Sequence, residues 1–320
     1  MIVTVTPNPA LDMTWRVDRL EPGQSHRVDA ALSRAGGKGL NVARVLYQQG
    51  EPVTALTTAG GAVGAELRAE LEASGVPHRL IPVVAETRRS LTLVDETAAS
   101  ATVLNEYGTA PTAAETGELW GAVFGAAAEA SAVVISGSQP RGADPVVLTS
   151  AIAKFRALGV PVLVDTSGAA LIDAAEAGAT ALKPNHHELA EATGATDVIL
   201  GARELLRRGP VLVLVSQAEE GMLLVHRDGR VVRARFPEVV RGNATGAGDA
   251  VSAAISVSLA DDPDLTAPDA LEVLARRAAA WGAAAVAAPQ AGELDPHLAR
   301  RTADVIITPV SAASPLEGAS

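Results

Sequence analysis

The chain has 320 residues, of which 48 % are apolar and only 2 % aromatic, and it carries a net charge of −11 and no cysteine. So large an apolar fraction provides a packed core and excludes low-complexity disorder. The acidic charge and the scarcity of aromatic rings exclude a general nucleic-acid binder. The lack of cysteine excludes disulfides, thiolate metal sites and a cysteine nucleophile.

Neither the first residues nor the longest apolar stretch indicates a targeting or membrane segment. Residues 1–7 have no basic region and no long apolar run, so they do not read as a signal peptide. The stretch 278–288 has 11 residues, whereas a membrane-spanning helix needs ~20. We therefore expect a cytoplasmic protein with no membrane partner.

Strands and helices are expected to alternate along most of the chain. The expected strands are 2–6, 15–17, 27–32, 53–57, 90–95, 101–105, 132–136, 160–165, 180–183, 211–216, 221–226 and 231–236. The expected helices are 41–49, 64–74, 113–130, 145–158, 169–177, 188–193, 198–208, 247–260 and 267–288. Continuously apolar runs such as 133–135 suit parallel strands that are buried on both faces. The pattern predicts an α/β fold with a doubly wound, mostly parallel sheet flanked by helices.

Two segments, at about 13–33 and 88–106, do not fit this alternation because they have polar faces and hairpin spacing. We expect them to form a small β-sheet lid over one edge of a single domain that spans residues 1–309. The tail 310–320 is small and polar, and we expect it to be disordered.

The strongest local signal is the sequence Asn243-Ala-Thr-Gly-Ala-Gly-Asp249, which precedes an apolar helix. Gly246 and Gly248 let backbone N–H groups approach an anion at a helix N-terminus. Asp249 would point into that site, where proton abstraction from a hydroxyl would give it a task. The alternative is a Gly-rich turn with an Asp N-cap, and spacing alone leaves the two about even.

A second Gly-rich segment, Gly36-Gly-Lys-Gly39, also precedes a helix and holds Lys38. It does not match the spacing of a P-loop, and a flexible turn with a solvated lysine is the alternative. Three further segments, 136–140, 165–168 and 183–188, follow expected strands, where open α/β sheets bind ligands. Each of the three could also be an ordinary loop with capping residues.

Two other groups of side chains have an ordinary interpretation. Arg88 and Arg89 are either a solvated basic pair or binders of a phosphate, which suits the arginine fork. His186 and His187 are adjacent and face different directions on a helix, so we expect exposed loop histidines and no structural zinc.

Taken together and in this order, the motifs resemble the PfkB (ribokinase-like) carbohydrate kinase family over residues 2 to about 308. The similarity is to its phosphosugar-kinase branch, which includes 1-phosphofructokinases and tagatose-6-phosphate kinases. The segments that carry the resemblance are 4–12, 36–46, 87–88, 136–140, 164–168, 183–188 and 246–249. The resemblance implies a ribokinase-like sheet with a β-sheet lid that often also forms a dimer interface.

The resemblance also implies roles for individual residues. Asp249 resembles the catalytic base, and the backbone amides of Gly246, Ala247 and Gly248 resemble the anion hole for the transferring phosphoryl group. The residues implied to hold sugar hydroxyls are Asp12, Gly37 and Asn41. Those implied to bind the phosphate of the substrate are Lys38, Arg88, Ser138 and, as a further candidate that would reach a partner subunit, Arg27.

On the nucleotide side, the resemblance implies ATP and Mg²⁺ as cofactors. The residues implied to contact ATP are Lys183, Asn185, Ser216, Gly221, Gly246 and Gly248, and Glu188 would help to place the magnesium ion indirectly. The sequence departs from the family at Ala218, which replaces a glycine close to the nucleotide phosphates, at Gln217, which replaces leucine, and at Ser90, where an asparagine is common.

The resulting hypothesis is an ATP-dependent kinase that phosphorylates a hydroxyl of a ketohexose phosphate, converting fructose 1-phosphate to fructose 1,6-bisphosphate. Tagatose 6-phosphate and fructose 6-phosphate are the alternative substrates. An alternative of another class is a catalytically impaired regulator that binds a sugar phosphate on the same fold. A homodimer through the lid is expected. A Rossmann dehydrogenase is disfavoured because no G-x-G-x-x-G follows the first strand.

Overall fold

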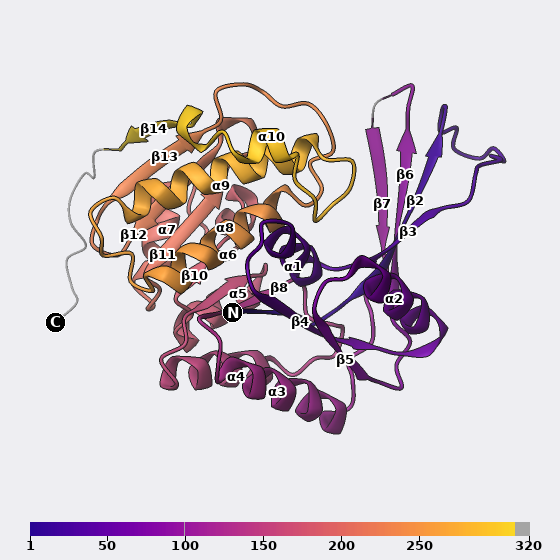
Figure 1. The fold of residues 1–320 in the computed structure, drawn as a ribbon, viewed down its shortest axis with the longest axis horizontal. Helices are drawn as coiled ribbons and strands as arrows, with labels where there is room; N and C mark the ends of the chain where they lie inside the picture. Colours follow the sequence, from indigo (N-terminus) through magenta and orange to yellow (C-terminus); the bar gives the residue numbers. More distant parts are fainter. Residues whose placement is uncertain (99, 311–320) are drawn as a thin grey trace.

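The computed structural model describes residues 1–98 and 100–310, and they form a large sheet covered by helices and a small projecting sheet (Figure 1). Of the tail predicted to be disordered, 311–320 lies outside the described residues. Val310 is described, and its N–H donates to the carbonyl oxygen of Val231 over 3.0 Å.

The large sheet has ten strands in the order β14-β13-β12-β11-β10-β9-β8-β1-β4-β5. The strands are β1 (Ile2–Thr6), β4 (Val53–Ala59), β5 (His78–Pro82), β8 (Ala132–Ser136), β9 (Val162–Asp165), β10 (Ala181–Leu182), β11 (Leu212–Ser216), β12 (Met222–His226), β13 (Val231–Arg235) and β14 (Ile306–Pro309). The pairs from β5 to β11 are parallel, whereas β11 to β14 pair antiparallel. The sheet is therefore mostly parallel, as predicted.

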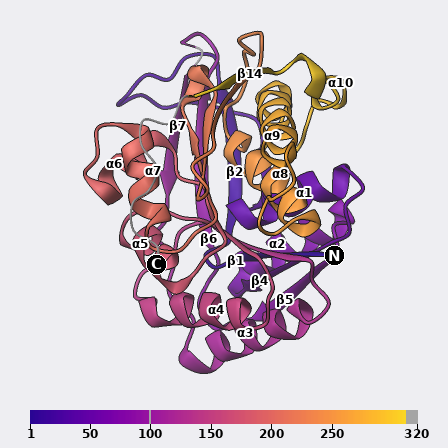
Figure 2. The same cartoon turned by 90° about the vertical axis from the view of Figure 1, so that its left-hand side faces the viewer.

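Helices cover both faces of this sheet (Figure 2). One face carries α1 (Lys38–Gln48), α2 (Gly61–Ser74), α8 (Ala247–Asp261) and α9 (Ala270–Ala287), with the short α10 (Pro296–Ala299) beside α9. The other carries α3 (Ala113–Ala127), α4 (Pro145–Ala157), α5 (Ala169–Ala177), α6 (His186–Thr193) and α7 (Val198–Leu206).

The continuous apolar runs of the strands follow from this double coverage. Along β8, Val133 and Ile135 join the core beneath α3 and α4, and Val134 joins the core beneath α1 and α8. Because successive strand residues face opposite sides of a sheet, both sets must be apolar when both sides are buried.

The small sheet projects from one end of the molecule (Figure 1) and has the strand order β3-β2-β6-β7. Its strands are β2 (Ala10–Val17), β3 (Leu32–Gly36), β6 (Arg88–Asp95) and β7 (Ser100–Asn105). β2 and β6 pair in parallel, and β6 and β7 form the predicted antiparallel hairpin. Every residue of the outer strand β7 is exposed. Hereafter we refer to this sheet as the lid.

The structure corrects several expected boundaries. The strand expected at 27–32 is wrong, because 27–31 has no regular structure and β3 begins only at Leu32. The first helix begins at Lys38, within the glycine segment, rather than at Asn41. β5 was missed because only Ile81 of its five residues is buried, so it lacks the apolar pattern of a central strand. Within 1–98 and 100–310, no helix is long and apolar enough to cross a membrane.

Candidate active site

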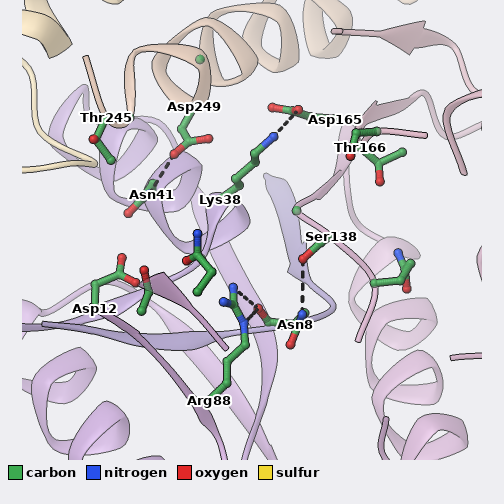
Figure 3. Close-up of a pocket in the computed structure, with 18 of the residues that line it drawn as sticks. Asn8, Asp12, Lys38, Asn41, Arg88, Ser138, Asp165, Thr166, Thr245 and Asp249 are labelled. Atoms are coloured by element: carbon green, nitrogen blue, oxygen red, sulfur yellow. Dashed lines mark hydrogen bonds and ion pairs between the residues drawn. The ribbon is translucent and has the colours of Figure 1, made fainter. Parts of the chain in front are cut away.

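A cavity of about 950 Å³ opens where the carboxyl ends of the parallel strands meet the lid and the amino end of α8 (Figure 3). Most of the predicted site residues line it: Asp12, Gly37, Lys38, Asn41, Arg88, Ser138, Lys183, Glu188, Gly246, Gly248 and Asp249. The topology explains the convergence, since β1, β8, β9 and β10 are neighbouring parallel strands that all end at this edge.

At the amino end of α8, the backbone of Gly246 packs closely against the backbone of Ala291. Gly246 has a φ of 89°, and a Cβ there would lie only 2.9 Å from Cα of Ala291. Both facts require glycine. No side chain of the described residues caps this end by a hydrogen bond. The N–H groups of Gly248 and Asp249 are therefore available to an anionic ligand, and the helix dipole favours one there.

Asp249 lies in that first turn and is buried, with a relative exposure of 5 %. Its Oδ2 accepts a hydrogen bond from Nδ2 of Asn41 over 2.8 Å, which fixes the carboxylate at the cavity wall (Figure 3). Burial, followed by the charge of Asp165, raises the pKa of Asp249 to about 6, although Asn41 and two lysines act in the opposite sense. A base of this kind is ionised at neutral pH and still holds a proton more strongly than an exposed aspartate.

Asp165, at the end of β9, is a second buried carboxylate, but its pKa is lowered where that of Asp249 is raised. It accepts from Lys38 Nζ over 3.1 Å, from Lys183 Nζ over 3.1 Å and from Ser252 Oγ over 3.0 Å. Burial alone would raise the pKa of Asp165, but the charges of Lys183 and Lys38 outweigh it and hold the pKa below its usual value. The carboxylate is therefore an ionised anchor for two ammonium groups.

The two lysines differ in what they can reach. The side chain of Lys183 is only 5 % exposed, whereas that of Lys38 is 42 % exposed. The charge of Asp165 raises the pKa of Lys38 despite its partial burial, so its ammonium group stays charged. Lys38 is thus the better placed of the two to touch a bound anion, and Lys183 mainly balances the buried carboxylate.

On the lid side of the cavity, Asp12 faces Arg88 and Ser90. Burial is the main cause that raises the pKa of Asp12 to about 6, and the Asp249 charge adds to it while Arg88 opposes it. The guanidinium of Arg88 donates from Nη2 to the carbonyl oxygen of Asn8 over 3.2 Å. Asn8 in turn donates from Nδ2 to Oγ of Ser138 over 3.3 Å (Figure 3).

The glycine segment before α1 packs closely against the lid on one side and the large sheet on the other. A Cβ on Gly36 would lie 2.0 Å from Oδ2 of Asp12, and one on Gly37 would lie 2.6 Å from Cγ2 of Thr6. Gly37 also has a φ of 115°, in the region that favours glycine. The flexible-turn interpretation is therefore wrong for this segment, which packs directly against Asp12.

The residues expected on the nucleotide side lie partly outside the cavity. Asn185 caps α6 in a reciprocal pair with Glu188, with both hydrogen bonds at 2.8 Å. Glu188 lines the cavity, but Asn185, Ser216 and Gly221 do not. Gly221 has a φ of 88°, and its Cβ would lie 2.2 Å from the carbonyl oxygen of Ala234. Ala218 has a φ of 49°, which is unusual for a residue other than glycine.

Two further predicted site residues are not among those that line the cavity. Arg27 is exposed on the irregular segment between β2 and β3 and does not line the cavity. Ala247 is the first residue of α8, where its backbone N–H donates to the carbonyl oxygen of Ala244 over 3.2 Å rather than staying free. Its expected part in an anion hole therefore requires that bond to be exchanged.

Sequence reasoning missed Asn8, which joins three parts of the site. Its side chain donates to the carbonyl oxygen of Tyr107 as well as to Ser138, and its own carbonyl accepts from Arg88. The signal was present, because Asn8 stands between two prolines directly after β1. A polar residue that follows a buried parallel strand lies at the ligand-binding edge.

Comparison with known proteins identifies the family. Residues 8–298 match the pfkB family of carbohydrate kinases. The chain belongs to the pfkB family. It is 34 % identical over 314 residues to the 1-phosphofructokinase of Xanthomonas campestris, a match that covers 95 % of this chain and 97 % of the relative. It is 37 % identical to the ATP-dependent 6-phosphofructokinase isozyme 2 of Mycobacterium tuberculosis, covering 81 % and 77 % of the two chains.

Solved structures agree on the architecture. The phosphofructokinase-2 of Escherichia coli in complex with potassium superimposes with a TM-score of 0.86 at 28 % identity, covering 94 % of this chain and 97 % of that one. The ribokinase of Arabidopsis thaliana, at 20 % identity and a TM-score of 0.72, shows the fold alone; it covers 94 % of this chain and 97 % of the ribokinase. The predicted ribokinase-like fold is confirmed, and as a carbohydrate kinase this pfkB protein transfers phosphate to an alcohol group.

Proposed function

We propose that this pfkB kinase transfers the γ-phosphoryl group of ATP to a free hydroxyl of fructose 1-phosphate and forms fructose 1,6-bisphosphate. The observation that carries the proposal is the position of Asp249. Its buried carboxylate, with a raised pKa, shares one cavity with the open amino end of α8 and with the cations Lys38 and Arg88. A base, an anion-binding backbone and a basic clamp are the parts that phosphoryl transfer to a sugar phosphate needs.

In the proposed step, Asp249 accepts the proton of the attacking hydroxyl while that oxygen forms its bond to the γ-phosphorus. The bond between the γ-phosphorus and the bridging oxygen breaks, and ADP leaves with that electron pair. Asn41 holds Asp249 in place through the 2.8 Å hydrogen bond. The free N–H groups at the amino end of α8 stabilise the charge on the transferring group, because these donors are oriented before the reaction.

The residues present fit a magnesium ion that is held largely by the nucleotide. Within the described part of the chain, no cluster of three or more histidine, aspartate or glutamate side chains could cage a metal. Mg²⁺ commonly binds through one or two carboxylates together with substrate phosphates and water. Glu188 lines the cavity and would help to place the ion indirectly, since its carboxylate also accepts from the N–H of Asn185, and the bound ion would neutralise charge on the phosphate oxygens.

The clamp for the phosphate that the sugar already carries is proposed to consist of Arg88, Ser138 and Lys38, with Arg27 as a candidate from a second copy of the chain. Arg88 and Ser138 lie on either side of Asn8, to which both are hydrogen-bonded. The 1-phosphofructokinase of X. campestris, whose length is matched almost entirely, supports fructose 1-phosphate as the acceptor.

Fructose 6-phosphate is the second candidate acceptor. It is supported by the M. tuberculosis relative named for 6-phosphofructokinase activity and by the E. coli phosphofructokinase-2 structure with fructose-6-phosphate, which superimposes with a TM-score of 0.81 and 30 % identity over 89 % of this chain and 93 % of that one. Tagatose 6-phosphate remains the third. A regulator without catalysis is not favoured, since Asp249 and its glycines form an intact site.

A substrate panel tests the proposal. ADP release is measured with ATP·Mg²⁺ and, in turn, fructose 1-phosphate, fructose 6-phosphate, tagatose 6-phosphate and the free ketohexoses. We expect the highest kcat/KM with fructose 1-phosphate. A preference for another sugar phosphate would overturn the choice of substrate, and turnover of free sugars alone would overturn the phosphosugar assignment. Binding of ATP·Mg²⁺ and sugar phosphate without turnover would support the regulator.

The lid supports the further proposal that this cytoplasmic enzyme works as a homodimer through that sheet. The outer strand β7 is exposed along its whole length, and it presents Val103 and Leu104 at 48 % and 54 % exposure. Leu32 on the opposite outer strand is 53 % exposed. An open edge with apolar side chains favours pairing with a second chain. Light scattering tests this, with a dimer expected and a monomer contradicting it.

A further inference from the structure

One cation that lines the cavity has no hydrogen-bond or ion-pair partner for its side chain among the described residues. Four cationic side chains line the cavity: Lys38, Arg88, Arg141 and Lys183. The two lysines are paired with Asp165, and Arg88 donates to the carbonyl oxygens of Asn8 and Glu106. Arg141 forms no hydrogen bond or ion pair through its side chain with any of residues 1–98 and 100–310. Its guanidinium instead lies over the ring of Tyr107, 5.5 Å from the centroid.

The backbone of Arg141 is nevertheless held in place. Its carbonyl oxygen accepts from the N–H of Ala110 over 3.2 Å, and it forms a parallel bridge with Thr109. The stack on Tyr107 further limits where the guanidinium can go. The side chain is therefore exposed but anchored at its base, which suits a group that must reach a ligand without a large ordering cost.

Arg141 contacts the segment 106–107, which Arg88 also contacts and to which Ser138 is linked through Asn8. Arg88 donates to the carbonyl oxygen of Glu106, Asn8 joins the carbonyl oxygen of Tyr107 to Ser138, and Arg141 covers the ring of Tyr107. Figure 3 shows Arg88, Asn8 and Ser138 together on the side of the cavity away from Thr245 and Asp249. The free guanidinium thus belongs to the side of the cavity opposite the transferring phosphoryl group.

A second unsatisfied group occurs two residues earlier in the same loop. Gln139 lines the cavity, and its Nε2 is buried without a hydrogen-bond partner in the described part of the protein. A buried donor left unpaired costs free energy, so a ligand oxygen at this position would offset that cost. Two unused donor groups on one short loop indicate a bound group rich in acceptor oxygens.

We propose that Arg141, together with Gln139, binds the phosphate that the sugar substrate already carries and so selects phosphorylated over free ketohexoses. The inference rests on the proposed function and deepens it. A phosphate offers three acceptor oxygens and matches the arginine fork, whereas a sugar hydroxyl does not. The nucleotide is the less suitable ligand, because the open helix end that receives its terminal phosphate lies on the other side of the cavity.

The test compares Arg141→Ala, Arg141→Lys and Gln139→Leu with the wild type, and uses Arg79→Ala, at an exposed position of β5, as the control. For Arg141→Ala, we expect KM for the sugar phosphate to rise about tenfold, since a charge-assisted hydrogen bond at an exposed site contributes at the low end of its range. Its kcat and its KM for ATP should stay within twofold. Arg141→Lys, which keeps the charge and loses the fork, and Gln139→Leu should each give a smaller increase.

Activity with a free ketohexose separates phosphate recognition from a general change of the cavity. We expect kcat/KM for the free sugar to be equal in Arg141→Ala and the wild type. An unchanged KM for the sugar phosphate would overturn the proposal, and so would an equal loss with phosphorylated and free sugars. Thermal melting of each variant confirms that the fold is retained.

Calorimetry with inorganic phosphate keeps this test independent of the proposed reaction. If the wild type turned over no sugar phosphate, the proposed function would fail. Weaker phosphate binding by Arg141→Ala than by Arg79→Ala would then still support an anion subsite at Arg141. Equal phosphate binding by the two variants would remove it.

Discussion

Asp249 and Asp165 are both buried in the wall of one cavity, yet their surroundings drive their pKa values in opposite directions. Asp165 touches two ammonium groups and a hydroxyl and stays ionised, whereas Asp249 receives one hydrogen bond from a neutral amide and has a pKa of about 6. Burial alone therefore does not set the chemistry of a carboxylate. The charges next to it decide whether it anchors other groups or exchanges a proton.

The largest expected effect concerns the reaction. Asp249→Asn keeps an oxygen that can accept the Asn41 hydrogen bond but removes the base, so kcat should fall about 10³-fold, within the range of general base catalysis. Sugar-phosphate binding, measured by calorimetry, should change little. Steady-state kinetics check the prediction, and a variant with near-normal kcat would show that another group takes the proton.

Asp165→Asn should instead act on stability. Because its folded pKa is lowered, ionised Asp165 contributes stability above its unfolded pKa, and that contribution is lost as the pH falls through the folded value. The substitution leaves the buried ammonium of Lys183 without its charge partner, and removing one member of a buried pair costs ~3–5 kcal/mol. Urea unfolding at pH 7.5 measures the loss. A change below the error of the method would mean that the network is not needed for folding.

In the same unfolding experiment, Asp249→Asn should change the free energy of unfolding in the opposite direction and stabilise the protein. Its folded pKa of about 6 exceeds the ordinary value of 3.8, so the stability linked to its protonation is present at low pH and lost as the pH rises through about 6. Removal of the charge should raise the free energy of unfolding at pH 8 by up to about 3 kcal/mol, and by little at pH 4. Destabilisation at pH 8 would contradict the contrast between the two carboxylates.

The sequence predicts best those turns, helices and strands that depend on residues close together along the chain. The turn at Gly246 was predicted because glycine, helix start and acid stand within four residues. The hairpin of β6 and β7 was predicted from two alternating runs around a short turn. The boundary of β3 was not, since its register is set by pairing with β2 and by the contact of Gly36 with Asp12.

The ion pairs, hydrogen-bond partners and pKa values of the site residues depend on contacts between segments far apart in the sequence, which spacing does not show. Lys183 is expected to contact the nucleotide, but spacing gives no sign of its ion pair with Asp165, which is also bonded to Ser252 from α8. Arg141 carries no motif of its own, and its free guanidinium is recognised only once the partners of the other three cations are known. The pKa of Asp249 likewise requires the burial and charges of the folded cavity.

The pH dependence of kcat/KM for fructose 1-phosphate tests most directly whether Asp249 is the base. Since the base must be ionised, we predict a plateau above about pH 6 and a decline of at least tenfold per pH unit well below it. Asp12, whose pKa is also about 6 and whose charge acts on Asp249, would steepen the decline. A profile that stays flat from pH 7 down to pH 4.5, with the protein still folded, would contradict a base with a raised pKa.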